Sequence, residues 1–105
     1  MARLTVSLLA QADTAYIARN LTAKAGHAVA ARYLDSFEKL YDRLTHHPAS
    51  GAPRPAIGPP IRIGIVSPYI VIYEHDARQD IVSILRIVHG RRRITGELLL
   101  TDIQS

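Results

Sequence analysis

The clearest pattern along the chain is an apolar stripe that precedes the first proline. Its members are spaced 4, 4, 3 and 4 positions apart, which places them on one face of a helix. They are Val29, Tyr33, Phe37, Leu40 and Leu44. Charged residues fill most of the intervening positions. We expect this helix to end before Pro48, because a proline forces the preceding residue out of the α region.

A second helical segment is predicted over residues 10–25, which contain neither glycine nor proline. Its expected apolar face combines neighbouring positions one turn apart. These positions are Ala12, Tyr16, Ile17 and Leu21. Gly26 then suits a left-handed helix cap. The short connection through Gly26 predicts an antiparallel helix hairpin.

Strand patterns lie on both sides of this hairpin. Residues 3–8 alternate between apolar and other positions and indicate a strand at or near an edge. Residues 61–66, 69–73 and 81–88 are rich in Ile and Val and are separated by short turns, which predicts antiparallel pairing. Tyr69 and Tyr73 lie on one side of their strand, where core packing is the expected role.

A proline-rich segment separates the helices from the last strands. Residues 48–60 hold five prolines in 13 positions, which excludes a regular helix or an inner strand. We interpret the segment as a surface crossing within one domain that spans residues 1–105. The expected order is β-α-α-β-β-β, an α+β fold with the helix hairpin packed on one face of a mostly antiparallel sheet.

Composition narrows the class of protein. The chain has 105 residues, 48% of them hydrophobic, and contains no cysteine. The absence of cysteine excludes disulfide scaffolds, Cys-ligated zinc and thiol nucleophiles. No apolar run approaches the ~20 residues of a membrane span, and residues 1–9 favour a first strand over a signal peptide. A cytoplasmic protein that makes no membrane contact is expected.

The net charge of +4 comes mostly from arginine, which supplies 11 of the 13 basic residues. Such a balance favours an acidic protein or a nucleic acid as partner. Arg86, Arg91, Arg92 and Arg93 form a cluster without an intervening acid. Arg86 alone favours a buried ion pair. The three adjacent arginines cannot all face one internal carboxylate, so they predict an outward basic ridge.

Histidines offer two further candidates. His89 follows the last predicted strand, where it suits either a general base or, as we favour, a structural hydrogen-bonding residue. His46 and His47 are adjacent and point in different directions, and no third ligand stands at a suitable spacing. We therefore expect no metal site, and attribute this pair to the favourable position of histidine at a helix C-terminus.

Several of these features occur together in one known family. The chain resembles the ParE branch of the ParE/RelE toxins of bacterial toxin–antitoxin pairs, from about residue 10 to residue 93. The most specific match is residues 84–93, Ile-Leu-Arg-Ile-Val-His-Gly-Arg-Arg-Arg. Further matches are Ala12-Asp13, Gly26, Ala30, Tyr33-Leu34, Pro48, Gly51, Arg54, Arg62 and the Tyr69–Tyr73 strand.

The resemblance implies a toxin that binds DNA gyrase and blocks replication without an enzymatic reaction or a cofactor. It also implies a ParD-like antitoxin that wraps around the helix hairpin and sheet edge, and through which the complex contacts DNA. The expected partner-binding residues are Arg86 and the ridge of Arg91, Arg92 and Arg93. A basic toxin suits an acidic antitoxin segment that folds on binding.

Two alternatives share the same fold. A RelE-like toxin would cleave messenger RNA on the ribosome, and its site would use Arg62, His89 and Arg91. Residues 94–105 contain no Tyr, His or Lys, which disfavours that chemistry, because a nuclease needs a group that moves protons. The third interpretation is an inactive member that is retained as an antitoxin-bound co-repressor.

Overall fold

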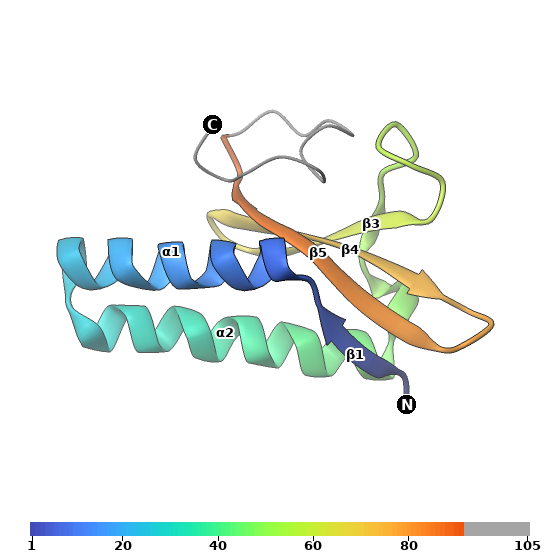
Figure 1. The fold of residues 1–105 in the computed structure, drawn as a ribbon, viewed down its shortest axis with the longest axis horizontal. Helices are drawn as coiled ribbons and strands as arrows, with labels where there is room; N and C mark the ends of the chain where they lie inside the picture. Colours follow the sequence, from blue (N-terminus) through green and yellow to red (C-terminus); the bar gives the residue numbers. More distant parts are fainter. Residues whose placement is uncertain (92–105) are drawn as a thin grey trace.

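A computed structural model describes residues 1–91 and arranges them as a helix hairpin against one face of a five-stranded sheet (Figure 1). The elements are β1 (Arg3–Val6), α1 (Leu8–Ala25), α2 (His27–His46), a 3₁₀ turn (Pro48–Ser50), β2 (Ala52–Pro53), β3 (Ile61–Val66), β4 (Tyr69–Asp76) and β5 (Ile81–His89). Neither helix in this part of the chain is long and apolar enough to cross a membrane.

The sheet has the strand order β1-β5-β4-β3-β2. β3, β4 and β5 form an antiparallel meander, and β1 pairs with β5 in parallel. This confirms the expected α+β class and a mostly antiparallel sheet. The structure adds β2, a two-residue strand within the proline-rich segment that pairs with β3. Its proline is accommodated because β2 lies at the sheet edge.

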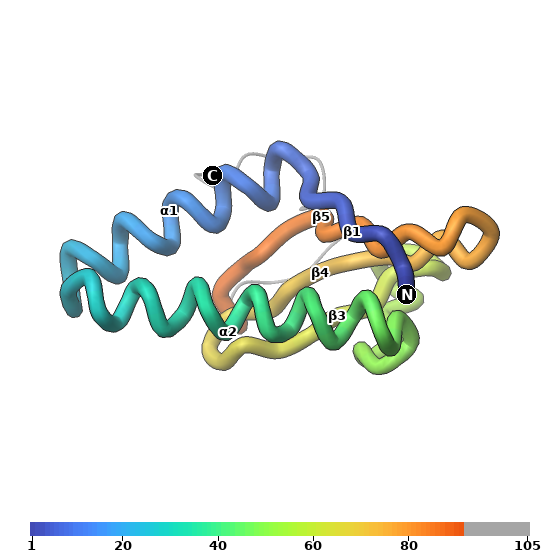
Figure 2. Tube along the Cα trace, turned by 90° about the horizontal axis from the view of Figure 1, so that it is seen from below, coloured from blue at the N-terminus to red at the C-terminus, as the bar shows by residue number. Residues whose placement is uncertain are grey.

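The boundary between β1 and α1 lies earlier than the alternation predicted. The side chain of Ser7 accepts a hydrogen bond from the Ala10 N–H at 3.0 Å and caps α1. Leu8 therefore opens the helix and is 83% exposed. At the other end Gly26 has a φ of 93°, which favours glycine. The turn between α1 and α2 projects beyond the sheet (Figures 1 and 2).

The predicted stripe of α2 forms the centre of the main core. Phe37, Leu40 and Leu44 are buried, and they pack with the helix-facing side chains of β4 and β5. These side chains are Tyr69, Val71, Tyr73, Val82, Ile84 and Ile87. Gly64 of β3 allows a close approach, because a Cβ there would lie 3.0 Å from a Leu40 methyl carbon. Tyr69 and Tyr73 thus have the core role expected from the sequence.

The predicted apolar face of α1 is wrong in part. Ala12 and Tyr16 are exposed, and the buried residues of this helix are Ala10, Asp13 and Ile17. The real face is therefore rotated by one position and has a carboxylate at its centre. Hydrophobicity alone does not identify such a face, because an aspartate normally indicates a solvent-exposed position.

Candidate functional site

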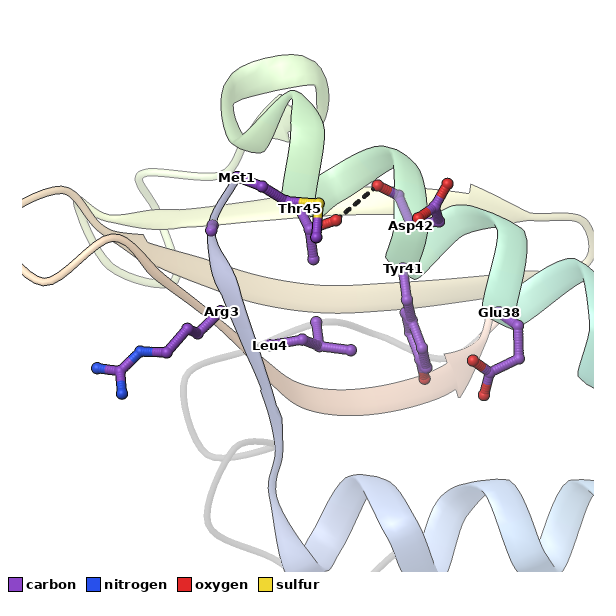
Figure 3. A pocket seen from close by; sticks show the side chains of 8 residues that line it. Met1, Arg3, Leu4, Glu38, Tyr41, Asp42 and Thr45 are labelled. Atoms are coloured by element: carbon purple, nitrogen blue, oxygen red, sulfur yellow. Dashed lines mark hydrogen bonds between the residues drawn. The ribbon is translucent and has the colours of Figure 1, made fainter.

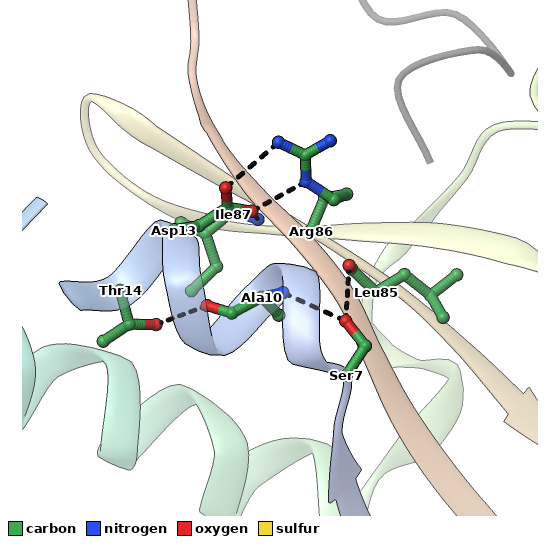
Figure 4. Close-up of polar contacts among 7 residues, drawn as sticks. All are labelled: Ser7, Ala10, Asp13, Thr14, Leu85, Arg86 and Ile87. Atoms are coloured by element: carbon green, nitrogen blue, oxygen red, sulfur yellow. Dashed lines mark hydrogen bonds and ion pairs between the residues drawn. The ribbon is translucent and has the colours of Figure 1, made fainter. Parts of the chain in front are cut away.

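Asp13 and Arg86 form a buried ion pair between α1 and β5 (Figure 4). Both side chains are completely buried, and the carboxylate accepts Arg86 Nε–H at 2.8 Å and Nη2–H at 3.0 Å. The same carboxylate accepts the Ile87 N–H at 2.8 Å. Three donors therefore satisfy Asp13, and a buried charge-assisted pair of this geometry fixes α1 on the sheet.

This pair lies where β1 stops covering β5. The β1 ladder ends at Val6, opposite Ile84. Beyond it the Ser7 hydroxyl donates to the Leu85 carbonyl at 2.8 Å. Two residues further along β5, the Asp13 carboxylate accepts the Ile87 N–H. The side chains of Ser7 and Asp13 thus form hydrogen bonds with the backbone of β5 where β1 no longer pairs with it. The prediction of Arg86 as a partner-binding residue is wrong, because its guanidinium is buried, and the alternative of an internal ion pair is confirmed.

Of the predicted basic ridge, only Arg91 lies within the described residues, just after β5. Arg91 is exposed, and its backbone N–H donates to Nδ1 of His89 at 3.1 Å. The His89 ring also meets the Tyr69 ring edge to face, with centroids 5.9 Å apart. His89 is therefore held in place by the turn and by Tyr69, as the structural interpretation expected. Arg92 and Arg93 lie outside the described residues.

Arg62 has a local structural role. Its Nη1 donates to the carbonyls of Ala49 at 3.1 Å and Gly51 at 2.8 Å. Arg62 pairs with Tyr73, whereas His89 pairs with Tyr69. Their Cα atoms are thus about 13 Å apart along the strand direction, at ~3.3 Å per residue, and one strand lies between them. The fold does not bring Arg62 together with His89 and Arg91.

Tyr73 links the proline-rich segment to the core. Its hydroxyl donates to the Pro48 carbonyl at 2.7 Å and accepts the Gly51 N–H at 2.9 Å. A side chain at position 51 would overlap this hydroxyl and the Ile63 carbonyl. Burial raises the pKa of Tyr73 above its ordinary value. Nothing in the sequence pattern indicated these bonds, because they join residues that are far apart in the chain.

The adjacent histidines take part in the C-terminal turn of α2. Nδ1 of His46 lies 2.8 Å from the Asp42 carbonyl, which fits a histidine that interacts with the end of a helix. Within residues 1–91 no group of three His, Asp or Glu side chains is placed to hold a metal ion.

A groove that the sequence did not indicate runs along α2 on the side that faces β1 and α1. It consists of two adjoining hollows of about 640 and 550 Å³ that share Glu38 and Tyr41. Tyr41 points from α2 toward α1, beside Glu38 (Figure 3). We call this the Tyr41 groove. Its second hollow has an apolar lining that includes Val6, Ala18 and Leu34.

The Tyr41 hydroxyl is buried and makes no hydrogen bond within the described part of the chain. Burial, followed by the nearby carboxylate of Glu38, raises the pKa of Tyr41 to about 12. The neighbouring Thr14 hydroxyl, which donates to the Ala10 carbonyl at 2.9 Å, partly opposes this rise in the pKa of Tyr41. The hydroxyl lies beneath the floor of the groove, out of contact with solvent.

Comparison with known proteins identifies the family. The sequence model described as "ParE toxin of type II toxin-antitoxin system, parDE" matches residues 4–94. The chain belongs to the ParE toxin family. Toxin ParE3 of Caulobacter vibrioides is 31% identical over 86 residues, which cover 82% of this chain and 84% of that protein. The resemblance found in residues 10–93 is thus confirmed at the level of the family.

Solved structures with the same fold come from two toxin–antitoxin systems. One is the chromosomal ParDE system of P. aeruginosa, with a TM-score of 0.71, 22% identity and coverage of 85% of this ParE-family chain and 96% of that chain. The other is the RelBE2 toxin–antitoxin complex of Mycobacterium tuberculosis, with a TM-score of 0.60, 18% identity and coverage of 84% and 96%. At these identities the likeness establishes the fold.

Proposed function

We propose that this ParE-family toxin poisons DNA gyrase and blocks replication without an enzymatic reaction. The observation that carries the proposal is the family match over residues 4–94. The toxin acts in the cytoplasm, where gyrase and the chromosome are found. In this proposal it requires no cofactor, and its target is held by surface contacts.

The arrangement of the candidate nuclease residues supports a non-enzymatic role. Arg62 donates to two backbone carbonyls, and one strand separates it from His89. His89 has its Nδ1 occupied by the Arg91 N–H. Phosphoryl transfer needs cations and a proton-transfer group around the same phosphate. The described residues that the sequence suggested for this chemistry do not surround one such position.

A ParD-like antitoxin neutralises the toxin in this proposal and alone contacts operator DNA. We place its contacts on the helix hairpin, along the Tyr41 groove, and on the ridge that begins at Arg91. The groove supplies an apolar lining for side chains of the antitoxin. The ridge supplies positive charge for acidic residues of the antitoxin.

One substitution separates the gyrase poison from a RelE-like nuclease. His89→Gln keeps a polar side chain of similar size. If His89 only supports the turn, toxicity and gyrase inhibition should fall no further than the fraction of folded protein. A general base would instead lose ~10²–10⁴ in rate while the fold stays intact. Primer extension on cellular RNA should show no cuts with either protein, and cuts that vanish in folded His89→Gln would favour the nuclease.

The ridge has its own test. Arg91→Glu should weaken antitoxin binding and reduce its salt dependence, because fewer charges are then attracted across the interface. Arg78→Glu is the matched control, since Arg78 is exposed in the turn between β4 and β5. Equal affinities and equal salt slopes for these two variants would remove the ridge from the antitoxin contact and leave the gyrase proposal untouched.

A further inference from the structure

The sheet has two apolar faces, and the helices cover only one of them (Figure 1). Successive residues of β4 point to opposite faces of the sheet. Tyr69 and Val71 pack in the core beneath the helices, whereas Ile70 and Ile72 belong to a separate cluster. We call this cluster the second core, and neither α1 nor α2 contributes a residue to it. Its other members are Ile57, Ile61, Ile63, Leu85 and Val88.

The second core is more deeply buried than residues 1–91 explain. Ile72 and Val88 are 0% and 3% exposed. Within residues 1–91, Ile57 is the only apolar side chain from outside the sheet that packs on this cluster, and it belongs to the segment that leads into β3. Val88 lies on β5, two strands away from β3, which is a distance of about 10 Å. Since one isoleucine beside β3 cannot also cover β5, a further segment must lie over this part of the face.

The apolar part of this face lies at the end where β5 finishes. Toward the β4–β5 turn the same face is polar, because Glu74 and Thr5 flank Ser83 from the two neighbouring strands. The hydroxyl of Thr5 donates to that of Ser83 at 3.0 Å. At the other end Val88 lies one residue before the end of β5. The chain therefore leaves the sheet at the margin of the apolar part.

The segment that follows has the composition that such a face requires. Five of the ten residues 94–103 are Ile or Leu, and positions 98–100 are three consecutive leucines. Seven positions lead from Arg91 to the first of these leucines, and they span up to ~23 Å. Ile72 pairs with a residue three positions before the end of β5, which places it about 10 Å back along the sheet. The leucines can therefore reach the second core of their own chain.

We propose that residues 94–103 of the same chain cover the second core, with the three leucines packed against Ile72 and Val88. The attachment of this segment at the margin of the face favours it over a second copy or a partner protein, because a linked segment is held at a high effective concentration. The face lies opposite the helix hairpin, so the hairpin surface remains accessible to a partner. The proposal does not depend on gyrase being the target.

Methyl NMR on the purified full-length chain tests this contact directly. The protein is labelled at Ile, Leu and Val methyl groups, and the leucines of residues 98–100 are assigned by single substitutions. We expect nuclear Overhauser effects between these leucine methyls and the methyls of Ile72 and Val88. A sample that mixes differently labelled chains detects only contacts between two molecules, and it should show no such effect.

Urea denaturation of substituted full-length chains gives an independent measurement. A variant with Leu98→Ser, Leu99→Ser and Leu100→Ser should lower the midpoint by roughly 1 M or more, because the leucines no longer bury apolar surface. Leu8→Ser is the matched control, since Leu8 is 83% exposed. Its midpoint should change by less than ~0.3 M.

A comparison of two backgrounds shows which face the leucines cover. Ile70→Ala removes part of the second core, whereas Leu21→Ala removes a partly buried side chain from the core beneath the helices. In the triple-serine chain, the shift in midpoint caused by Ile70→Ala should fall to roughly half of its value in the natural chain, because the two sites are coupled. Leu21→Ala should cause the same shift in both chains.

Three results would overturn the proposal. The first is an absence of effects between the three leucines and Ile72 or Val88 in a folded protein. The second is that these effects arise only between different molecules, which would assign the face to a second copy. The third is an unchanged midpoint in the triple-serine chain, or an equal shift from Ile70→Ala in both backgrounds.

Discussion

Loss of the Asp13 carboxylate should destabilise the toxin more than any other polar substitution on α1. Asp13→Ala leaves the buried guanidinium of Arg86 without this partner and the Ile87 N–H without an acceptor. Breaking a buried ion pair by removal of one member costs about 3–5 kcal/mol. We therefore expect the free energy of unfolding to fall by about 4 kcal/mol, which is a large part of the total for a domain of this size.

Urea denaturation followed by circular dichroism measures this effect. With a slope of about 1–1.5 kcal/mol per molar urea, the midpoint should fall by roughly 3–4 M. Thr14→Ala is the matched control, because Thr14 neighbours Asp13 on α1 and its hydroxyl donates within the helix to Ala10. Its expected cost is about 1 kcal/mol or less.

A double-mutant cycle tests the same pair through the interaction energy between its two members. Arg86→Met removes the positive charge and retains most of the side-chain length. The double variant should be more stable than the sum of the single effects implies, by about 2–3 kcal/mol. A loss below 1 kcal/mol in Asp13→Ala, or additive effects in the cycle, would refute the view that this pair holds α1 on the sheet.

Three further substitutions test the core and the buried tyrosines by the same unfolding measurement. Phe37→Ala should cost about 3–5 kcal/mol as a large-to-small change in the core, and an unchanged melting temperature would exclude Phe37 from it. Tyr73→Phe should cost about 2 kcal/mol, because it removes two hydrogen bonds. Tyr41→Phe should cost nothing or stabilise by about 1 kcal/mol, because its hydroxyl has no partner in residues 1–91; a loss comparable to that of Tyr73→Phe would show a hidden partner. Because burial raises the pKa of Tyr41 to about 12, stability should be complete below pH ~10 and fall as the pH rises toward 12, and this fall should be weaker in Tyr41→Phe.

The sequence predicted the elements whose side chains follow a regular period. The α2 stripe through Phe37, Leu40 and Leu44 marks a buried face. The alternation of Ile61, Ile63 and Ile65 does so only in part, because Ile65 is 56% exposed. The same reasoning failed for α1, where the central buried residue is Asp13. A charged residue becomes buried only because a partner, Arg86, reaches it from 73 positions away, and no local pattern encodes that distance.

The candidate site was predictable to a similar degree. The family resemblance was visible in the sequence and is confirmed, whereas the basic ridge stays a prediction of which only Arg91 lies within the described residues. The Tyr41 groove was not visible. A groove depends on how two elements approach each other, and Tyr41 reads in the sequence simply as another apolar position on α2.

The gyrase cleavage assay tests the central claim most directly. Purified toxin is incubated with gyrase, ATP and relaxed plasmid, and the DNA is analysed after detergent and protease treatment. The account predicts dose-dependent loss of supercoiling and accumulation of linear DNA, with the same effect from folded His89→Gln. Unchanged gyrase activity at toxin concentrations that cleave messenger RNA on ribosomes would contradict it.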